Sequence, residues 1–277
     1  MSNISQKGAA GPGFDLYATT SAATSPVYSD ISNSTLTGSR WDTNDGREFV
    51  LVQVAGTALS AGTVIQGPAA QTNAVGLSPA TTSTTGYSSA FPIVAPIGGK
   101  QIQIASGATA ILANRFSGGY LTVVSGTGLG QTLSISSNTA ASTTSAFVVT
   151  LEDQFTTATD STSRFTLTIN TYGSRFGTDY TTDGVIVSPT TLTGKVIGVT
   201  AYPIPASTAT VASYGFVQTR GPVACLAGST VALGLDVGVP TSTAGMLITY
   251  AVATTTRIGT TLVASASGAY NLIDVQL

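Results

Sequence analysis

The chain has 277 residues, a formal net charge of −2 and only 8% charged residues, about a third of the roughly 25% that is usual in soluble domains. It contains no histidine and a single cysteine, Cys225. These counts exclude Ser-His-Asp and Cys-His triads, histidine-ligated metals, intrachain disulfides and cysteine-ligated iron–sulfur clusters. Ten Lys and Arg residues are too few for a basic face, so we expect no nucleic-acid partner.

The composition indicates β-structure. Hydrophobic residues make up 42% of the chain, yet no apolar stretch reaches the ~18 uninterrupted residues that span a bilayer, so no membrane partner is expected. Disordered chains combine low hydrophobicity with high net charge, and this chain has neither. Thr and Val suit a pleated sheet, and no helical stripe of apolar residues is sustained. The sequence therefore predicts an all-β protein with a sandwich or barrel-type core.

Residues 1–40 are predicted to form an extended N-terminal arm. Residues 8–13 are rich in glycine, and residues 1–7 contain no apolar stretch, so no secretory signal is expected. A disordered terminus is the alternative and the commoner fate of such segments. If the arm docks on a neighbouring subunit, the apolar residues available as contacts are Phe14, Leu16, Tyr17, Val27, Tyr28 and Ile31.

Short apolar runs separated by turn residues predict the strands of the folded part. An Asp-Gly turn signal at 45–46 leads into a strand over 48–54. From residue 100 onward the spacing of about 10–15 residues is typical of a sandwich or barrel. Further strands are predicted at 61–65, 101–104, 120–124, 131–135, 147–151, 164–169, 184–187, 195–201, 214–218, 230–233, 247–253, 260–264 and 270–277.

An internal similarity suggests the domain organisation. Residues 49–64 and 216–231 both read as a strand, a glycine turn, an Ala-Gly-Thr/Ser stretch and the start of a second strand. One copy precedes and the other follows residues 100–175. This arrangement predicts a core β domain formed by 41–99 and 176–277, with an inserted β domain at 100–175.

No motif predicts catalysis, a cofactor or a metal site. The glycine-rich stretch 126–131 is not G-x-G-x-x-G and precedes no helix, so it is interpreted as a hairpin turn. Glu152, Asp153 and Asp160 are the densest acids, and their surroundings favour solvated strand-end acids over a hydrolase carboxylate pair or a calcium loop. Cys225 has apolar neighbours, which indicates a buried, unreactive thiol. The protein is therefore not expected to be an enzyme.

Several segments resemble virion proteins of tailed bacteriophages, namely the capsid decoration (cement) or head structural proteins. The resemblance implies a non-enzymatic protein on the capsid exterior. It covers about half of the chain and is carried by Phe-Ser-Gly-Gly-Tyr-Leu at 116–121, Gly-Thr-Gly-Leu-Gly-Gln at 126–131, Ile-Ser-Ser-Asn-Thr-Ala at 135–140, and the stretches 41–47, 214–222 and 267–277.

The expected function is that of a virion structural protein that binds the outer surface of an icosahedral phage capsid and stabilises it. The expected partners are the major capsid protein and further copies of the chain, with a homotrimer as the preferred assembly. A nearly uncharged surface suits a subunit that is covered by neighbours. A tail, fibre or baseplate component that contacts the host surface is the alternative, and a hydrolase is the third hypothesis.

Overall fold

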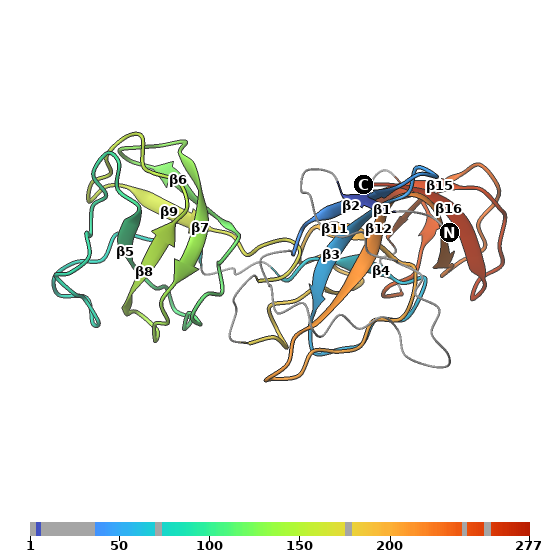
Figure 1. Cartoon of the computed structure of the whole chain (residues 1–277), viewed down its shortest axis with the longest axis horizontal. Helices are drawn as coiled ribbons and strands as arrows, with labels where there is room; N and C mark the ends of the chain where they lie inside the picture. Colours follow the sequence, from blue (N-terminus) through green and yellow to red (C-terminus); the bar gives the residue numbers. More distant parts are fainter. Residues whose placement is uncertain (1–3, 7–36, 70–73, 175–178, 240–242, 252–255) are drawn as a thin grey trace. The chain divides into compact units, whose positions relative to one another are not determined.

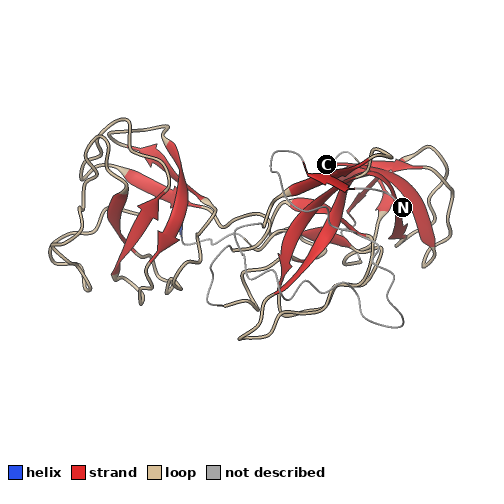
Figure 2. Ribbon diagram, in the orientation of Figure 1, coloured by secondary structure: helices blue, strands red, loops and turns tan. Residues whose placement is uncertain are grey.

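The computed structural model describes residues 4–6, 37–69, 74–174, 179–239, 243–251 and 256–277. These residues form strands and loops and contain no α-helix (Figure 2), which confirms the predicted all-β class. The chain divides into two compact units. Unit 1 comprises Met1–Pro68, Thr171–Gly173 and Tyr180–Leu277, and unit 2 comprises Ala69–Asn170 and Ser174–Asp179.

Unit 2 is a small antiparallel barrel. Its sheet has the strand order β5-β8-β7-β6-β9, and Figure 1 shows these strands curling around one another. The apolar side of each strand faces a single core that includes Ile102, Leu121 and Phe165, all 0% exposed. The strands are β5 (Gln101–Ala105), β6 (Tyr120–Ser125), β7 (Thr132–Asn138), β8 (Ala146–Leu151) and β9 (Arg164–Leu167).

A segment before β5 closes this barrel. Leu77 exchanges backbone hydrogen bonds with Phe165 on one edge strand, at 2.8 and 2.9 Å. On the other edge strand, the backbone N–H of Ala105 donates to the carbonyl oxygen of Ser78 at 3.0 Å. The sequence assigned residues 69–99 to the core domain, but these contacts place them in unit 2. The pairing depends on residues 25 or more positions apart, which local patterns do not show.

Unit 1 is built around one larger antiparallel sheet. Its main order is β1-β2-β3-β12-β16-β15-β13-β14, and a branch runs from β12 through β11 and β4 to β10. The strands are β1 (Ile4–Gln6), β2 (Arg40–Thr43), β3 (Glu48–Val54), β4 (Val64–Gln66), β10 (Ile186–Val187), β11 (Val196–Thr200), β12 (Ser213–Leu226), β13 (Asp236–Val239), β14 (Ile248–Thr249), β15 (Thr256–Thr261) and β16 (Tyr270–Gln276).

The sheet of unit 1 curls into two lobes that share β12. In the first lobe the ring β3-β12-β11-β4-β10 closes where Val185 bridges Val54. In the second lobe the ring β12-β16-β15-β13-β14 closes where Leu247 bridges Ala227. One apolar cluster lies within the first lobe, and a second cluster fills the second lobe and extends to Val64, Val196 and Val199 on β4 and β11. The two segments whose similarity suggested a discontinuous core both lie in unit 1, and their first strands, β3 and β12, pair directly.

Strand β12 changes character halfway along. Up to Thr219 every residue is buried; beyond it, exposed and buried residues alternate. The register with β3 shifts between Gln218 and Arg220, and Gly221 has a positive φ of 85°. The sequence predicted that this strand would end at residue 218, because Gly-Pro is typically a strand breaker. It continues because β16 pairs with it through Pro222 as far as Leu226.

Candidate functional site

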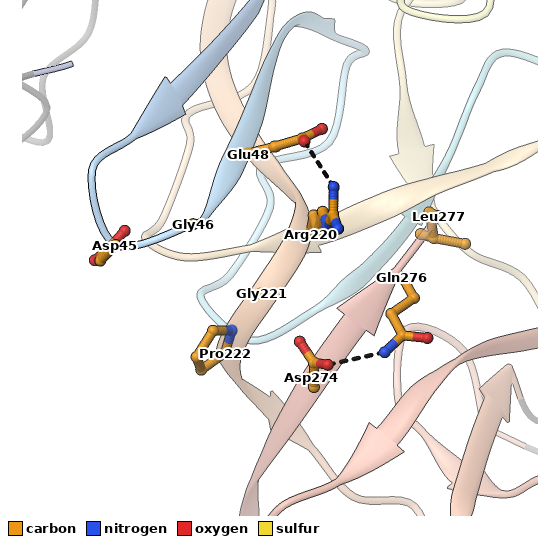
Figure 3. A pocket seen from close by; sticks show the side chains of 9 residues that line it. All are labelled: Asp45, Gly46, Glu48, Arg220, Gly221, Pro222, Asp274, Gln276 and Leu277. Atoms are coloured by element: carbon orange, nitrogen blue, oxygen red, sulfur yellow. Dashed lines mark hydrogen bonds and ion pairs between the residues drawn. The ribbon is translucent and has the colours of Figure 1, made fainter. Parts of the chain in front are cut away.

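A groove of about 670 Å³ lies where β12 bends. It is bounded by the turn between β2 and β3, the bend itself and the end of β16 (Figure 3). The register explains why these elements meet, since Arg220 pairs with Glu48 on one side and with Gln276 on the other. The lining residues are Asp45, Gly46, Glu48, Arg220, Gly221, Pro222, Asp274, Gln276 and Leu277.

The charged groups in the groove are paired with one another. Arg220 lies 3.2 Å from a carboxylate oxygen of Glu48, and the amide of Gln276 donates to Asp274 at 2.8 Å (Figure 3). Arg47 lies 2.7 Å from Asp45, and hydrogen bonds from Arg47 and then Thr43 lower the pKa of Asp45 to about 2. Exposed pairs of this kind stabilise a fold by less than about 1 kcal/mol. The groove therefore presents positive and negative groups in fixed positions.

An apolar surface is formed by β16, which also contributes Asp274 and Gln276 to the groove, and by the two residues that follow β15. We call it the apolar face and define it by Leu262, Val263, Tyr270 and Leu272, which are 41%, 52%, 59% and 39% exposed. The backbone N–H of Leu262, the residue after β15, donates to the carbonyl oxygen of Leu272 at 2.8 Å, which places Leu262 beside β16. Large apolar side chains gathered on an exposed sheet face mark interaction sites in soluble proteins.

The position of Tyr270 in this face is fixed by the turn at residues 61–62, in the first of the two similar segments. Its hydroxyl donates to the carbonyl oxygen of Ala61 at 3.3 Å. A Cβ at Gly62 would lie only 2.4 Å from Cε1 of Tyr270, and Gly62 has a φ of +70°. Glycine is therefore required at position 62 both for the backbone conformation and for the close approach of the ring.

Unit 2 presents a second apolar surface at the tips of three loops. The loops are 94–99, 126–131 and 155–160, and hydrogen bonds join them, including Gly98 N–H to the carbonyl oxygen of Phe155 at 2.8 Å. Ile97 and Leu129 are 71% and 67% exposed at these tips. We call this surface the loop end.

The acids singled out in the sequence hold turns in place. Asp153 accepts a hydrogen bond from the backbone N–H of Ser134 at 2.9 Å, which lowers its pKa. Asp160 accepts hydrogen bonds from the hydroxyls of Thr127, at 2.5 Å, and Thr162, at 2.6 Å, and these lower its pKa to about 2. The glycine-rich stretch 126–131 is thus a turn tied to the Asp160 loop.

Other residues named in the sequence analysis fall into two groups. Cys225 is buried, as predicted, and burial raises the pKa of its thiol to about 12. The six arm residues, which are Phe14, Leu16, Tyr17, Val27, Tyr28 and Ile31, lie outside the described residues.

Within the described ranges, His, Cys, Asp and Glu residues form no group of three or more that could hold a metal ion. The same residues include no helix long and apolar enough to cross a membrane. Comparisons of the chain with protein-family models, with curated proteins and with solved structures found no match.

The residues of the apolar face were not identified as functional from the sequence. A signal for them exists in β16, where apolar residues occupy both phases of the alternation. Ile273 and Val275 are 0% exposed and face the core, whereas Tyr270 and Leu272 face outward. A strand with one solvated face normally carries polar residues in the outward phase, so this departure indicates a covered surface.

Proposed function

We propose that this protein is a virion structural protein that binds the outer surface of an icosahedral phage capsid and stabilises it. The proposal draws on the resemblance of its segments to capsid decoration proteins, and the observation that carries it is the apolar face. Its four large side chains, exposed on β16 and directly after β15, would be covered by a partner, and the polar groove at the other end of β16 would orient that partner. The major capsid protein is the proposed partner and the capsid exterior the proposed location.

The proposed mechanism is bracing by a rigid surface. A contact of standard size buries about 800 Å² on each partner, enough for one copy to cover a seam between subunits. Because the apolar face carries no charged side chain, binding is expected to weaken little as salt is raised. Association of copies, for example as a homotrimer, would multiply the attachment points on the shell.

A pair of matched variants tests the proposal. Leu272→Asp places a charge in the apolar face on β16, whereas Val211→Asp places the same charge at an exposed valine (53%) in a loop of unit 1. Burying an unpaired charge is costly, so Leu272→Asp is expected to weaken co-sedimentation with purified capsids by at least about tenfold, and Val211→Asp is expected to leave it unchanged. Both variants should retain the β-type circular dichroism spectrum.

Equal binding by Leu272→Asp and the unmodified protein would show that the apolar face does not contact the capsid. A particle image with density for the chain on the tail alone would reject the capsid role. That outcome would favour the second candidate, a tail, fibre or baseplate component that contacts the host. The loop end of unit 2 is the observation behind that candidate, since exposed Ile97 and Leu129 on joined loops suit a contact surface.

A further inference from the structure

Strand β16 contributes side chains to both the groove and the apolar face. Its residues alternate between buried and outward positions, and the outward row consists of Tyr270, Leu272, Asp274 and Gln276. Outward neighbours on one strand lie about 7 Å apart, so Asp274 is one such step from Leu272 and two from Tyr270. A partner that covers the apolar face therefore also reaches the groove.

The neighbouring strands widen this row into a surface. On β12, exposed Ala224 pairs with Leu272 and exposed Pro222 pairs with Asp274. On β15, half-buried Thr260 pairs with Asp274 from the other side. Directly paired residues on antiparallel strands have side chains on the same face of the sheet. Along β16, this surface therefore changes from apolar at Leu272 to acidic at Asp274.

Asp274 differs from the other two carboxylates of the groove. Asp45 and Glu48 each form an ion pair with an arginine of this chain. Asp274 instead accepts a hydrogen bond from the neutral amide of Gln276 at 2.8 Å (Figure 3), and it forms no ion pair with any residue that the structure describes. Its negative charge is therefore not balanced by a neighbouring cation among these residues.

Covering the apolar face would change the surroundings of Asp274. A partner seated on Leu272 excludes water from the adjacent part of the groove, and a carboxylate that loses water is destabilised unless a cation pairs with it. The groove has a volume of about 670 Å³ and admits a long side chain. Lysine and arginine suit this position, because their stems pack on apolar atoms while their charged ends reach a polar site.

We propose that the partner of the apolar face carries a lysine or arginine beside its own apolar patch, and that this side chain enters the groove and pairs with Asp274. The inference rests on the proposed function, since it describes the capsid surface that would meet the same face. The apolar contacts would supply most of the affinity. The ion pair would fix the orientation of the bound protein, because any other register leaves the partner's cation unpaired.

Two isosteric substitutions in the groove test the ion pair. Asp274→Asn removes the negative charge but keeps an oxygen that can accept from Gln276. Asp45→Asn is the matched control, because it removes one charge from the same groove at a carboxylate that already pairs within the chain. Asp274→Asn is expected to weaken co-sedimentation with purified capsids about tenfold, as is typical for a lost hydrogen bond to a charged group, and Asp45→Asn by less than about threefold.

The salt dependence of binding distinguishes a lost charge from a disturbed fold. The Debye length falls from about 10 Å at 0.1 M salt to about 3 Å at 1 M. The gap between Asp274→Asn and the unmodified protein is therefore expected to narrow over this range. A gap of the same size at both concentrations, or equal losses in Asp274→Asn and Asp45→Asn, would overturn the inference.

Leu272→Asp separates this inference from the proposed function. Weak capsid binding by Leu272→Asp together with full binding by Asp274→Asn would overturn the ion pair and leave the proposed function in place. Full binding by both variants would overturn both. Loss of self-association in Leu272→Asp would in that case identify a second copy of the chain as the occupant of the apolar face.

Discussion

The sheets of the two units close on themselves in different ways. Unit 2 closes five strands with one extra segment, and its described residues enclose a single core. Unit 1 instead divides its interior among three clusters, two inside its lobes and a third, around Trp41 and Phe216, on the other side of β3 and β12. A single closed barrel is a self-contained folding unit, whereas the lobes of unit 1 depend on one shared strand.

The largest expected effect separates the two units. Phe165 is fully buried in unit 2, so Phe165→Ala should destabilise that unit by about 3–5 kcal/mol through lost burial and a cavity. Trp41 is the only tryptophan in the chain and lies in unit 1, so its fluorescence reports that unit alone. In urea, circular dichroism is expected to show a new early transition while the Trp41 transition stays in place. A shift of both transitions together would mean that the units unfold as one.

A second variant tests the packing of Gly62 against Tyr270 in unit 1. Gly62→Ala adds a Cβ at positive φ and forces it against Tyr270, so unit 1 is expected to lose about 2–3 kcal/mol. Gly46→Ala is the matched control: its φ is +83°, but no atom lies within 4 Å of the added Cβ, and the expected loss is about 1 kcal/mol. The Trp41 transition in urea measures both. Equal losses would show that the Tyr270 ring moves aside freely.

The smallest effect concerns pH and a turn of unit 2. Asp160 in unit 2 has a folded-state pKa of about 2 against 3.8 for a free carboxyl. The stabilisation from its carboxylate is therefore present above pH 3.8 and is lost as the pH falls through 2. Asp160→Asn should lower the melting temperature of unit 2 slightly at pH 7 and by much less at pH 2. An equal difference at pH 7 and pH 2 would assign the effect to the amide itself.

Much of the strand pattern could be predicted from the sequence, because alternation is a local signal. The strand expected at 48–54 is β3 with the same bounds, and β6 and β8 each differ from expectation by one residue. Residues 230–233 were expected to form a strand, but in the structure only Val231 makes a bridge, to Ser265. Leu233 in this segment is 66% exposed, so a longer strand there would not bury its side chain.

Features that depend on distant parts of the chain could not be predicted. The closing role of Leu77, the continuation of β12 through Pro222 and the groove at its bend all require strands that are far apart in sequence. The apolar face left only an indirect signal, the apolar residues in both phases of β16, because exposure of Tyr270 depends on which side of β16 faces the core. The burial of Cys225 was predictable, since its immediate neighbours are apolar.

The shared strand β12 has a mechanical consequence. Its ladders with β3, β11 and β16 run parallel to its own axis, so a pull along that axis loads many backbone hydrogen bonds in shear at the same moment. Those bonds must fail together rather than one by one, as they would if a sheet were peeled from its edge. The direction of β12 is therefore the stiff direction of unit 1, along which tension would be carried with the least yielding.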